Sequence, residues 1–81
     1  MNKIDLKKAL LDIISDIAPD EDISNIADET PFRDQIELDS MDFLDIVLEL
    51  RKRFKIHIPE EEYHNLTTMN STVEYLLPKM T

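Results

Sequence analysis

The sequence contains no cysteine and no glycine among its 81 residues. Without cysteine the chain has no disulfide framework, no thiolate metal site and no cysteine nucleophile, so any thiol chemistry must come from an added group. Without glycine, every turn that needs a positive φ must use Asn, Asp or a strained residue. Long apolar runs are also missing, so we expect no membrane partner and a cytoplasmic location.

Basic residues are few as well: Lys and Arg together number 9, against 18 Asp and Glu, which gives a formal charge of -9. This charge repels nucleic acid phosphates, which excludes nucleic-acid binding, and attracts basic protein surfaces. A chain this short predicts a single domain over residues 1–81, with a modest core and no roomy enzyme pocket. We therefore expect a monomer that is not an enzyme and acts through its partners.

The first half of the chain predicts one helix and one long connection. Apolar residues at helical spacing indicate a helix over residues 3–18, which Pro19 stops. Residues 20–38 break into short polar pieces, and we interpret them as a long loop pinned to the core, with room for one helical turn. The pinning residues are Ile23, Ile26, Phe32, Ile36 and Leu38.

The second half of the chain predicts the remaining helices. Residues 41–54 form the strongest helical segment, with capping residue types before it and three cations in its last turn. Pro59 and the three glutamates after it predict a short helix that reaches residue 66. Ser71 and Glu74 predict the capping box of a last helix, which Pro78 ends.

No strand-length alternation of apolar and polar residues appears, so the predicted fold class is all-α. We expect a small four-helix bundle of three longer helices and one short helix. A long loop should separate the first longer helix from the second.

The helix over residues 41–54 carries two apolar stripes. The first is expected to face the core and contains Phe43, Ile46, Val47, Leu50 and Phe54. The second, called here the outer stripe, contains Met41, Leu44 and Leu48, with Asp45 and Lys52 beside it. Two interpretations of the outer stripe stay open. A helix crossed by two neighbours buries both stripes, whereas an exposed outer stripe is a partner-docking surface rimmed by charge.

Ser40 stands at the start of the same helix. For an arbitrary serine in this position, simple capping is the favoured interpretation. If Asp39 caps the helix instead, with Asp42 three residues on, the Ser40 hydroxyl is left free at the first helical position. A phosphodiester attached there would lie near the partial positive charge of the helix N-terminus.

Residues 38–44, Leu-Asp-Ser-Met-Asp-Phe-Leu, resemble the D-S-L attachment motif of acyl carrier proteins. The resemblance covers nearly the whole chain, because Phe32, Phe54 and the segments over residues 56–60 and 67–76 fall where that family has similar features. It implies that a phosphopantetheinyl transferase attaches 4'-phosphopantetheine from coenzyme A to Ser40, the residue after Asp39. Acyl-loading and acyl-transfer enzymes would then use the thioester cargo, acyl or aminoacyl, on that arm.

Departures from the family pattern imply a specialised carrier in a fatty acid, polyketide or related pathway. Glu37, Lys55 and Asn70 stand where members of the family usually have glycine, and Met41 replaces a leucine. Two cations also stand where fatty-acid-synthesis carriers tend to be acidic. The face expected to bind partners therefore has mixed polarity and consists of Met41, Asp42, Leu44, Asp45, Leu48, Arg51 and Lys52.

The competing hypothesis is an unmodified, acidic helical interaction module in which Ser40 only caps its helix. Metal sites are not expected. Residues 20–22 are acidic but lack the ligand spacing of a calcium loop. His57 and His64 have no cysteine to complete a zinc site.

Overall fold

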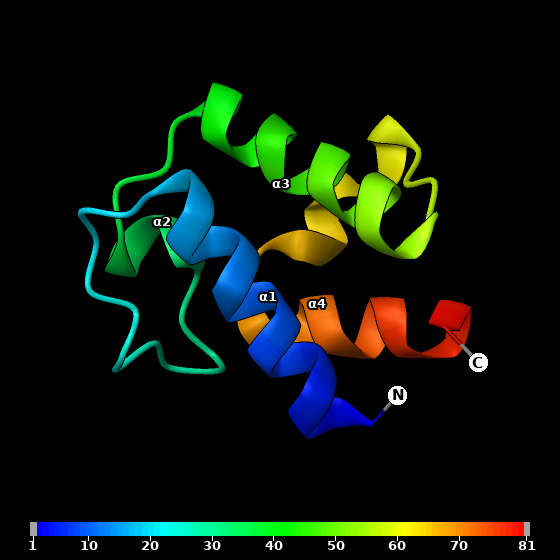
Figure 1. Cartoon of the computed structure of the whole chain (residues 1–81), viewed down its shortest axis with the longest axis horizontal. Helices are drawn as coiled ribbons and strands as arrows, with labels where there is room; N and C mark the ends of the chain where they lie inside the picture. Colours follow the sequence, from blue (N-terminus) through cyan, green and yellow to red (C-terminus); the bar gives the residue numbers. More distant parts are fainter. Residues whose placement is uncertain (1, 81) are drawn as a thin grey trace.

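The computed structural model describes residues 2–80 and is helical, with no strand in that range. Figure 1 shows the α-helices in chain order. The elements are α1 (Lys3–Ile17), α2 (Phe32–Gln35), α3 (Ser40–Phe54), the 3-10 helix η1 (Glu60–Leu66), α4 (Met69–Leu76) and the 3-10 turn η2 (Leu77–Met80). The predicted all-α class is confirmed, and the predicted short helix after Pro59 is η1.

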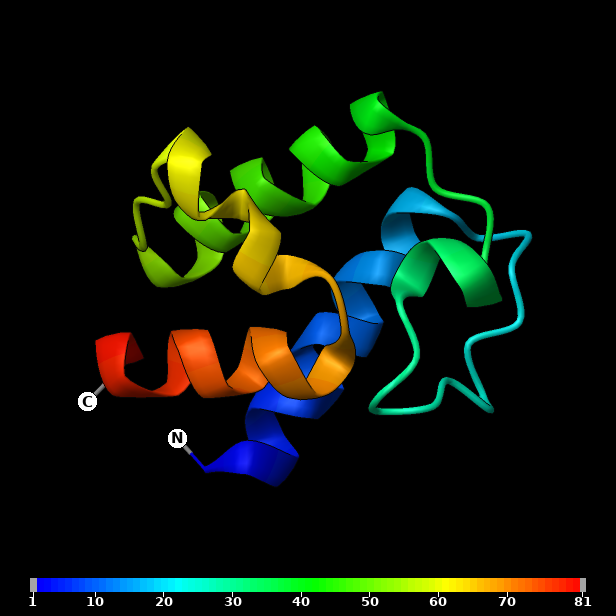
Figure 2. The same ribbon diagram turned by 180° about the vertical axis from the view of Figure 1, so that it is seen from behind.

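The helices surround one core. In the two opposite views, α3 and α4 lie at opposite edges of the molecule, with α1 crossing on one face and η1 on the other (Figures 1 and 2). In α1, α3 and α4 the buried side chains recur at helical spacing, and those of α3 belong to its first apolar stripe. They are Leu6, Leu10, Ile13 and Ile14 of α1, Ile46, Val47 and Leu50 of α3, and Met69, Val73 and Leu76 of α4.

The long connection between α1 and α3 is ordered by α2, the predicted helical turn. Phe32 and Ile36 are buried, as predicted for residues that pin the loop. The Gln35 amide group donates to the carbonyl oxygens of Ala27 and Thr30 at 3.0 and 2.8 Å, and accepts from the Ala27 N–H at 2.6 Å. The Gln35 side chain therefore satisfies backbone groups of the loop that have no backbone partner within residues 2–80.

The segment before α4 also holds the loop. The Phe32 N–H donates to the Thr67 carbonyl at 3.0 Å, and the Asn70 N–H donates to the Asp28 carbonyl at 2.9 Å. Backbone hydrogen bonds therefore join the loop before α3 directly to α4 and to the residue pair that precedes it.

The prediction that Ser71 caps the last helix is wrong. The N-cap is Thr68, whose Oγ1 accepts from the Ser71 N–H at 3.0 Å, while the Ser71 hydroxyl accepts from the Thr68 N–H at 3.1 Å. Ser71 is therefore the third residue of α4, and the helix starts at Met69. The α-helix ends at Leu76, two residues before Pro78, and the 3-10 turn η2 follows it to Met80.

The C-terminal end of α3 shows how the chain turns without glycine. Lys55 follows the last residue of the helix with φ 57° and ψ 34°, the left-handed conformation, and its N–H donates to the Arg51 carbonyl at 2.9 Å. It is the one non-glycine residue with positive φ in the part of the chain that the structure describes. Lys55 is therefore the strained residue that we expected from the lack of glycine.

Candidate functional site

The N-terminus of α3 places the Ser40 hydroxyl at the surface. Asp39 is extended, with φ -87° and ψ -179°, and its Oδ1 accepts from the Asp42 N–H at 2.8 Å. The Asp42 side chain returns a longer bond, 3.4 Å, from the Asp39 N–H. Because this reciprocal capping box satisfies two otherwise unpaired donors, Ser40 is not needed as a cap. The alternative in which Asp39 caps the helix is the one observed.

Ser40 is the first residue of α3 and is exposed. Its hydroxyl makes no hydrogen bond to another residue within the described range. The N–H groups of the first helical turn and the helix dipole favour negative charge at this point. A phosphate ester on this hydroxyl would therefore gain favourable electrostatics from the helix itself.

The outer stripe is exposed, which decides between the two interpretations left open by the sequence. Met41, Leu44 and Leu48 are 69%, 42% and 50% exposed, although large apolar side chains are usually buried. They follow one another along α3 from the residue next to Ser40. The stripe is therefore available to a partner and is not part of the core.

Charged residues border the outer stripe as the sequence predicted. Asp45 is exposed, Asp42 is half-buried because it takes part in the capping box, and Arg51 and Lys52 are exposed in the last turn of α3. The predicted site residues therefore share one accessible helix, with carboxylates near Ser40 and cations at the far end.

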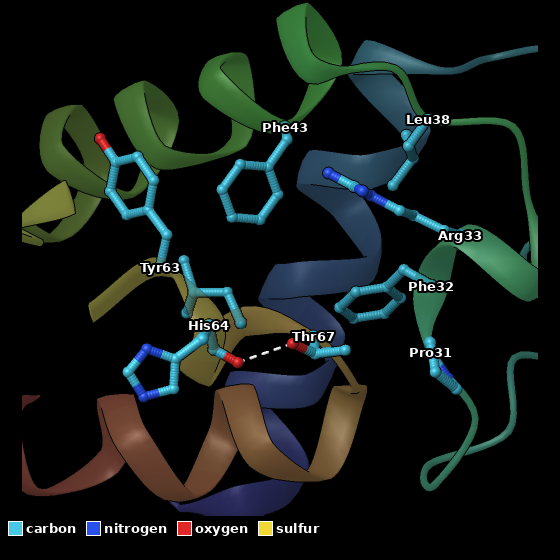
Figure 3. Close-up of a pocket in the computed structure, with 9 residues that line it drawn as sticks. Pro31, Phe32, Arg33, Leu38, Phe43, Tyr63, His64 and Thr67 are labelled. Atoms are coloured by element: carbon cyan, nitrogen blue, oxygen red, sulfur yellow. Dashed lines mark hydrogen bonds between the residues drawn. The ribbon is translucent and has the colours of Figure 1, made fainter. Parts of the chain in front are cut away.

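A pocket lies next to this helix, at a place that the sequence did not specify. It has a volume of about 380 Å³ and lies between α2, α3 and η1, as Figure 3 shows. Its lining residues are Pro31, Phe32, Arg33, Leu38, Phe43, Tyr63, His64, Leu66 and Thr67. Only tertiary packing brings η1 beside α2, so no local sequence signal could have revealed it.

Phe43 forms part of the wall of this pocket. The sequence assigned Phe43 to the core-facing stripe, and it is only half-buried because it meets the pocket rather than closed core. Its ring contacts Tyr63 of η1 edge-on, with ring centroids 5.5 Å apart and an interplanar angle of 68°. This geometry is a favourable aromatic arrangement that holds η1 against α3 while leaving the pocket open.

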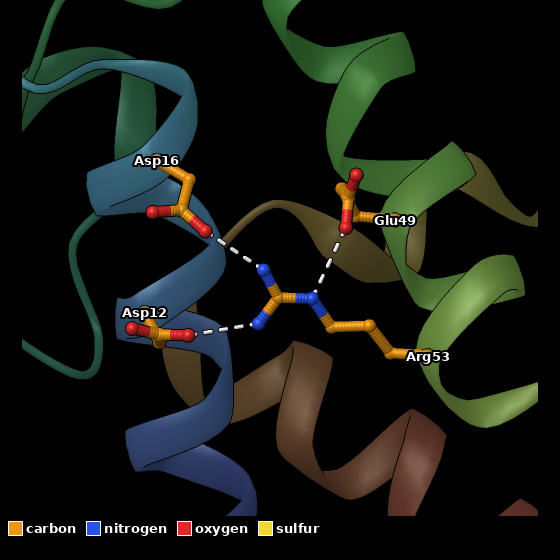
Figure 4. A network of polar contacts seen from close by, with 4 residues as sticks. All are labelled: Asp12, Asp16, Glu49 and Arg53. Atoms are coloured by element: carbon orange, nitrogen blue, oxygen red, sulfur yellow. Dashed lines mark hydrogen bonds and ion pairs between the residues drawn. The ribbon is translucent and has the colours of Figure 1, made fainter.

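Arg53 ties the far end of α3 to α1. Its Nη1 donates to Asp12 Oδ2 at 2.8 Å, its Nη2 to Asp16 Oδ2 at 2.8 Å and its Nε to Glu49 Oε2 at 3.0 Å (Figure 4). The hydrogen bonds that Arg53 donates to Asp12, then to Glu49 and Asp16, raise the pKa of Arg53 above its ordinary value. Arg53 therefore pairs with carboxylates of the protein itself, whereas Arg51 and Lys52 have no salt bridge within residues 2–80.

Within residues 2–80, no cluster of His, Cys, Asp and Glu side chains is arranged to hold a metal ion. In the same range, no helix combines the length and apolar character that crossing a membrane requires.

Comparison with known proteins identifies the class of this domain. The family described as "Phosphopantetheine attachment site" matches residues 8–76. The chain is 32% identical over 78 residues to the acyl carrier protein of Rubrobacter xylanophilus, with 93% of this chain and 96% of that protein covered. It is 27% identical over 74 residues to the polyketide-8 synthase acyl carrier protein 2 of Streptomyces avermitilis, with 91% and 84% covered.

The fold and the matched family define a helical carrier domain that bears a phosphopantetheine group. The chain belongs to the acyl carrier protein family, as the resemblance of residues 38–44 predicted. Its role is to carry, not to catalyse, and its cofactor is covalently attached 4'-phosphopantetheine. Proteins of this family work with a phosphopantetheinyl transferase and with biosynthetic enzymes that use the carried group.

Proposed function

We propose that Ser40 is the attachment residue for 4'-phosphopantetheine in this carrier. The observation that carries the proposal is the exposed, unbonded hydroxyl at the first residue of α3, on a helix that Asp39 already caps. Modifying this hydroxyl removes no cap, so the helix start is preserved. The residues present fit the group, because the new phosphodiester lies at the end of the helix that favours an anion.

The attachment step forms one bond and breaks another. The Ser40 oxygen bonds to the phosphorus of the phosphopantetheine portion of coenzyme A, and adenosine bisphosphate leaves. The hydroxyl proton passes to a base of the transferase, because no side chain within residues 2–80 hydrogen-bonds to the Ser40 hydroxyl to accept it. Asp39 keeps the helix start rigid during this step through its bond to the Asp42 N–H. Once bound, the group supplies the terminal thiol that holds the cargo as a thioester.

The outer stripe is the surface on which partner enzymes bind in this proposal. Met41 lies next to Ser40 in the sequence, so an enzyme that binds the outer stripe has Ser40 at the edge of the interface. Asp42 and Asp45 attract basic partner residues near Ser40, whereas Arg51 and Lys52 attract acidic ones at the far end. This mixture of charges favours a dedicated loading enzyme over the enzymes of general fatty acid synthesis.

The finer assignment is a carrier of acyl or aminoacyl groups in a specialised fatty acid, polyketide or related pathway. Arg51 and Lys52 support it, because both cations are exposed on the partner-binding helix. We propose a single domain over residues 1–81 that acts as a cytoplasmic monomer. Its partners are the transferase, acyl-loading enzymes and acyl-transfer enzymes.

Intact-mass measurement after incubation with coenzyme A and a phosphopantetheinyl transferase tests the assignment. The wild-type chain should gain the mass of one phosphopantetheine, and Ser40→Ala should gain none while keeping its helical circular dichroism. Ser15→Ala, which removes an exposed hydroxyl from α1, is the matched control and should be modified like the wild type.

Two results would contradict the proposal. If Ser40→Ala still gains the group, the attachment residue lies elsewhere in the chain. If the wild type stays unmodified with several transferases, Ser40 serves no carrier function and the interaction-module hypothesis replaces it.

A further inference from the structure

Arg33 of α2 turns its side chain into the pocket between α2, α3 and η1. Figure 3 shows the guanidinium extending below Leu38 toward the ring of Phe43. Most of the surrounding wall is apolar, since Phe32, Leu38 and Phe43 contribute to it. Arg33 is itself exposed, so its guanidinium lies at the open side of the pocket, where an anion that enters from solvent can pair with it.

The guanidinium has no anionic partner in the part of the chain that the structure describes, although the sequence contains 18 acidic residues. Asp39 and Asp42 border a neighbouring hollow together with Arg33, yet no salt bridge joins them to it. Arg53 is the opposite case, because carboxylates of Asp12, Asp16 and Glu49 surround it. The protein therefore leaves one arginine unpaired beside an apolar pocket.

The pocket is within reach of a group tethered to Ser40. Leu38, which lines it, precedes Ser40 by two residues, so their Cα atoms are at most about 7 Å apart. Phe43, on the opposite wall, follows Ser40 by three residues within the first turn of α3. The volume of about 380 Å³ is at the small end of ligand pockets, which suits a short cargo.

We propose that Arg33 makes this carrier selective for short acyl groups that end in a carboxylate. The apolar part of the cargo would contact Phe32, Leu38 and Phe43, and its terminal carboxylate would accept charge-assisted hydrogen bonds from the guanidinium. This inference rests on the proposed function, because the cargo must be tethered at Ser40. It adds the chemical class of the cargo and the residue that recognises it.

A comparison of two cargos of equal carbon length distinguishes recognition of a carboxylate by Arg33 from burial of an apolar chain alone. Glutaryl and pentanoyl groups would be attached through their coenzyme A thioesters to the wild type, to Arg33→Gln and to Lys8→Gln. Lys8 is the control, since it is an exposed cation of α1 outside the pocket lining and outside the face proposed to bind partners. The readouts are the melting temperature of each loaded form and the amide chemical shifts of Phe43 and Thr67.

In the wild type, the glutaryl form should melt at least about 4 °C above the pentanoyl form. The shifts of Phe43 and Thr67 should move on loading with glutaryl. Arg33→Gln should abolish the difference between the two cargos, and Lys8→Gln should keep it.

Three outcomes overturn the inference. The first is a melting temperature of the wild-type pentanoyl form that equals or exceeds that of the glutaryl form, and the second is a difference that survives in Arg33→Gln. The third is a loss in Arg33→Gln that is as large for the unloaded, phosphopantetheine-bearing form as for the glutaryl form, which would assign Arg33 to the phosphodiester. Failure of all variants to take up any group would refute the attachment at Ser40, which is a separate result.

Discussion

At the residue scale, Asp39 and Ser40 divide two tasks that one serine often combines at a helix start. Asp39 accepts from the Asp42 N–H at 2.8 Å and so fixes the first turn of α3. The Ser40 hydroxyl then remains free for chemistry. Removing that hydroxyl should therefore change the free energy of unfolding little, whereas loss of the Asp39 cap would cost about 1 kcal/mol.

The left-handed backbone conformation of Lys55 affects the stability of the domain at the end of α3. We predict that Lys55→Gly raises the free energy of unfolding by up to about 1 kcal/mol, because its φ of 57° is costly for a side chain with a Cβ atom. The melting temperature should rise by roughly 4–8 °C per kcal/mol in a domain of this size. Thermal unfolding followed by circular dichroism measures the change.

The control for this prediction is Lys55→Ala, which removes the charge and keeps the Cβ atom, and it should give no such gain. A clear loss of stability in Lys55→Gly would mean that α3 ends differently in solution.

At the element scale, α3 packs its first apolar stripe into the core and leaves its outer stripe in solvent. Leu50 is 0% exposed, whereas Leu44, less than two turns earlier, is 42% exposed. One helix thus supports the bundle and offers a surface to partners. The two roles use different residues, so they can be separated by mutation.

We predict that Leu44→Arg weakens modification by the transferase and leaves the fold intact. The lost apolar contact, roughly 1.5–3 kcal/mol for a leucine buried on binding, should lower kcat/KM at least about tenfold. Steady-state kinetics of phosphopantetheine transfer and the melting temperature of the unmodified chain are the two measurements.

Leu50→Arg in the same helix is the matched control and should unfold the domain, because it buries an unpaired charge. If Leu44→Arg melts the domain in the same way, the outer stripe is needed for folding. Partner binding would then have to use another face, such as the loop before Ser40.

At the scale of the whole molecule, charge works against folding. A formal charge of -9 on a chain of 81 residues repels itself when the chain is compact. Arg53 offsets part of this repulsion where α1 and α3 meet, because it pairs with Asp12 and Asp16 of α1 and Glu49 of α3. Each of these pairs lies near the surface and contributes little by itself.

We predict that added salt raises the melting temperature between low and physiological ionic strength. Salt screens the repulsion among 18 acidic residues, and the few surface ion pairs that it also weakens contribute less. Divalent cations should act in the same direction without a specific site. Thermal unfolding at a series of sodium chloride concentrations measures the effect, and a melting temperature that does not change with salt would contradict it.

Local signals in the sequence determined the helices and the start of α3. Apolar spacing specified α1 and α3, and the order Asp39-Ser40-Met41-Asp42 contained the capping box that leaves Ser40 free. The same type of signal misplaced the start of α4, because Thr68 and Ser71 are both good N-cap residues. Pairing of Pro31 with Thr68 in an isolated bridge, together with the bond from the Ser71 hydroxyl to the Asn65 carbonyl, decides for Thr68.

Tertiary structure alone decided which apolar residues of α3 stay exposed and where a pocket opens. Leu44 belongs to the outer stripe, whose burial the sequence left open, and only the packing of the other helices leaves it exposed. The pocket beside the unpaired Arg33 depends on how α2, α3 and η1, three consecutive elements, pack against one another. Such features have no local signal, because burial and cavity formation depend on which surfaces meet after the helices have formed.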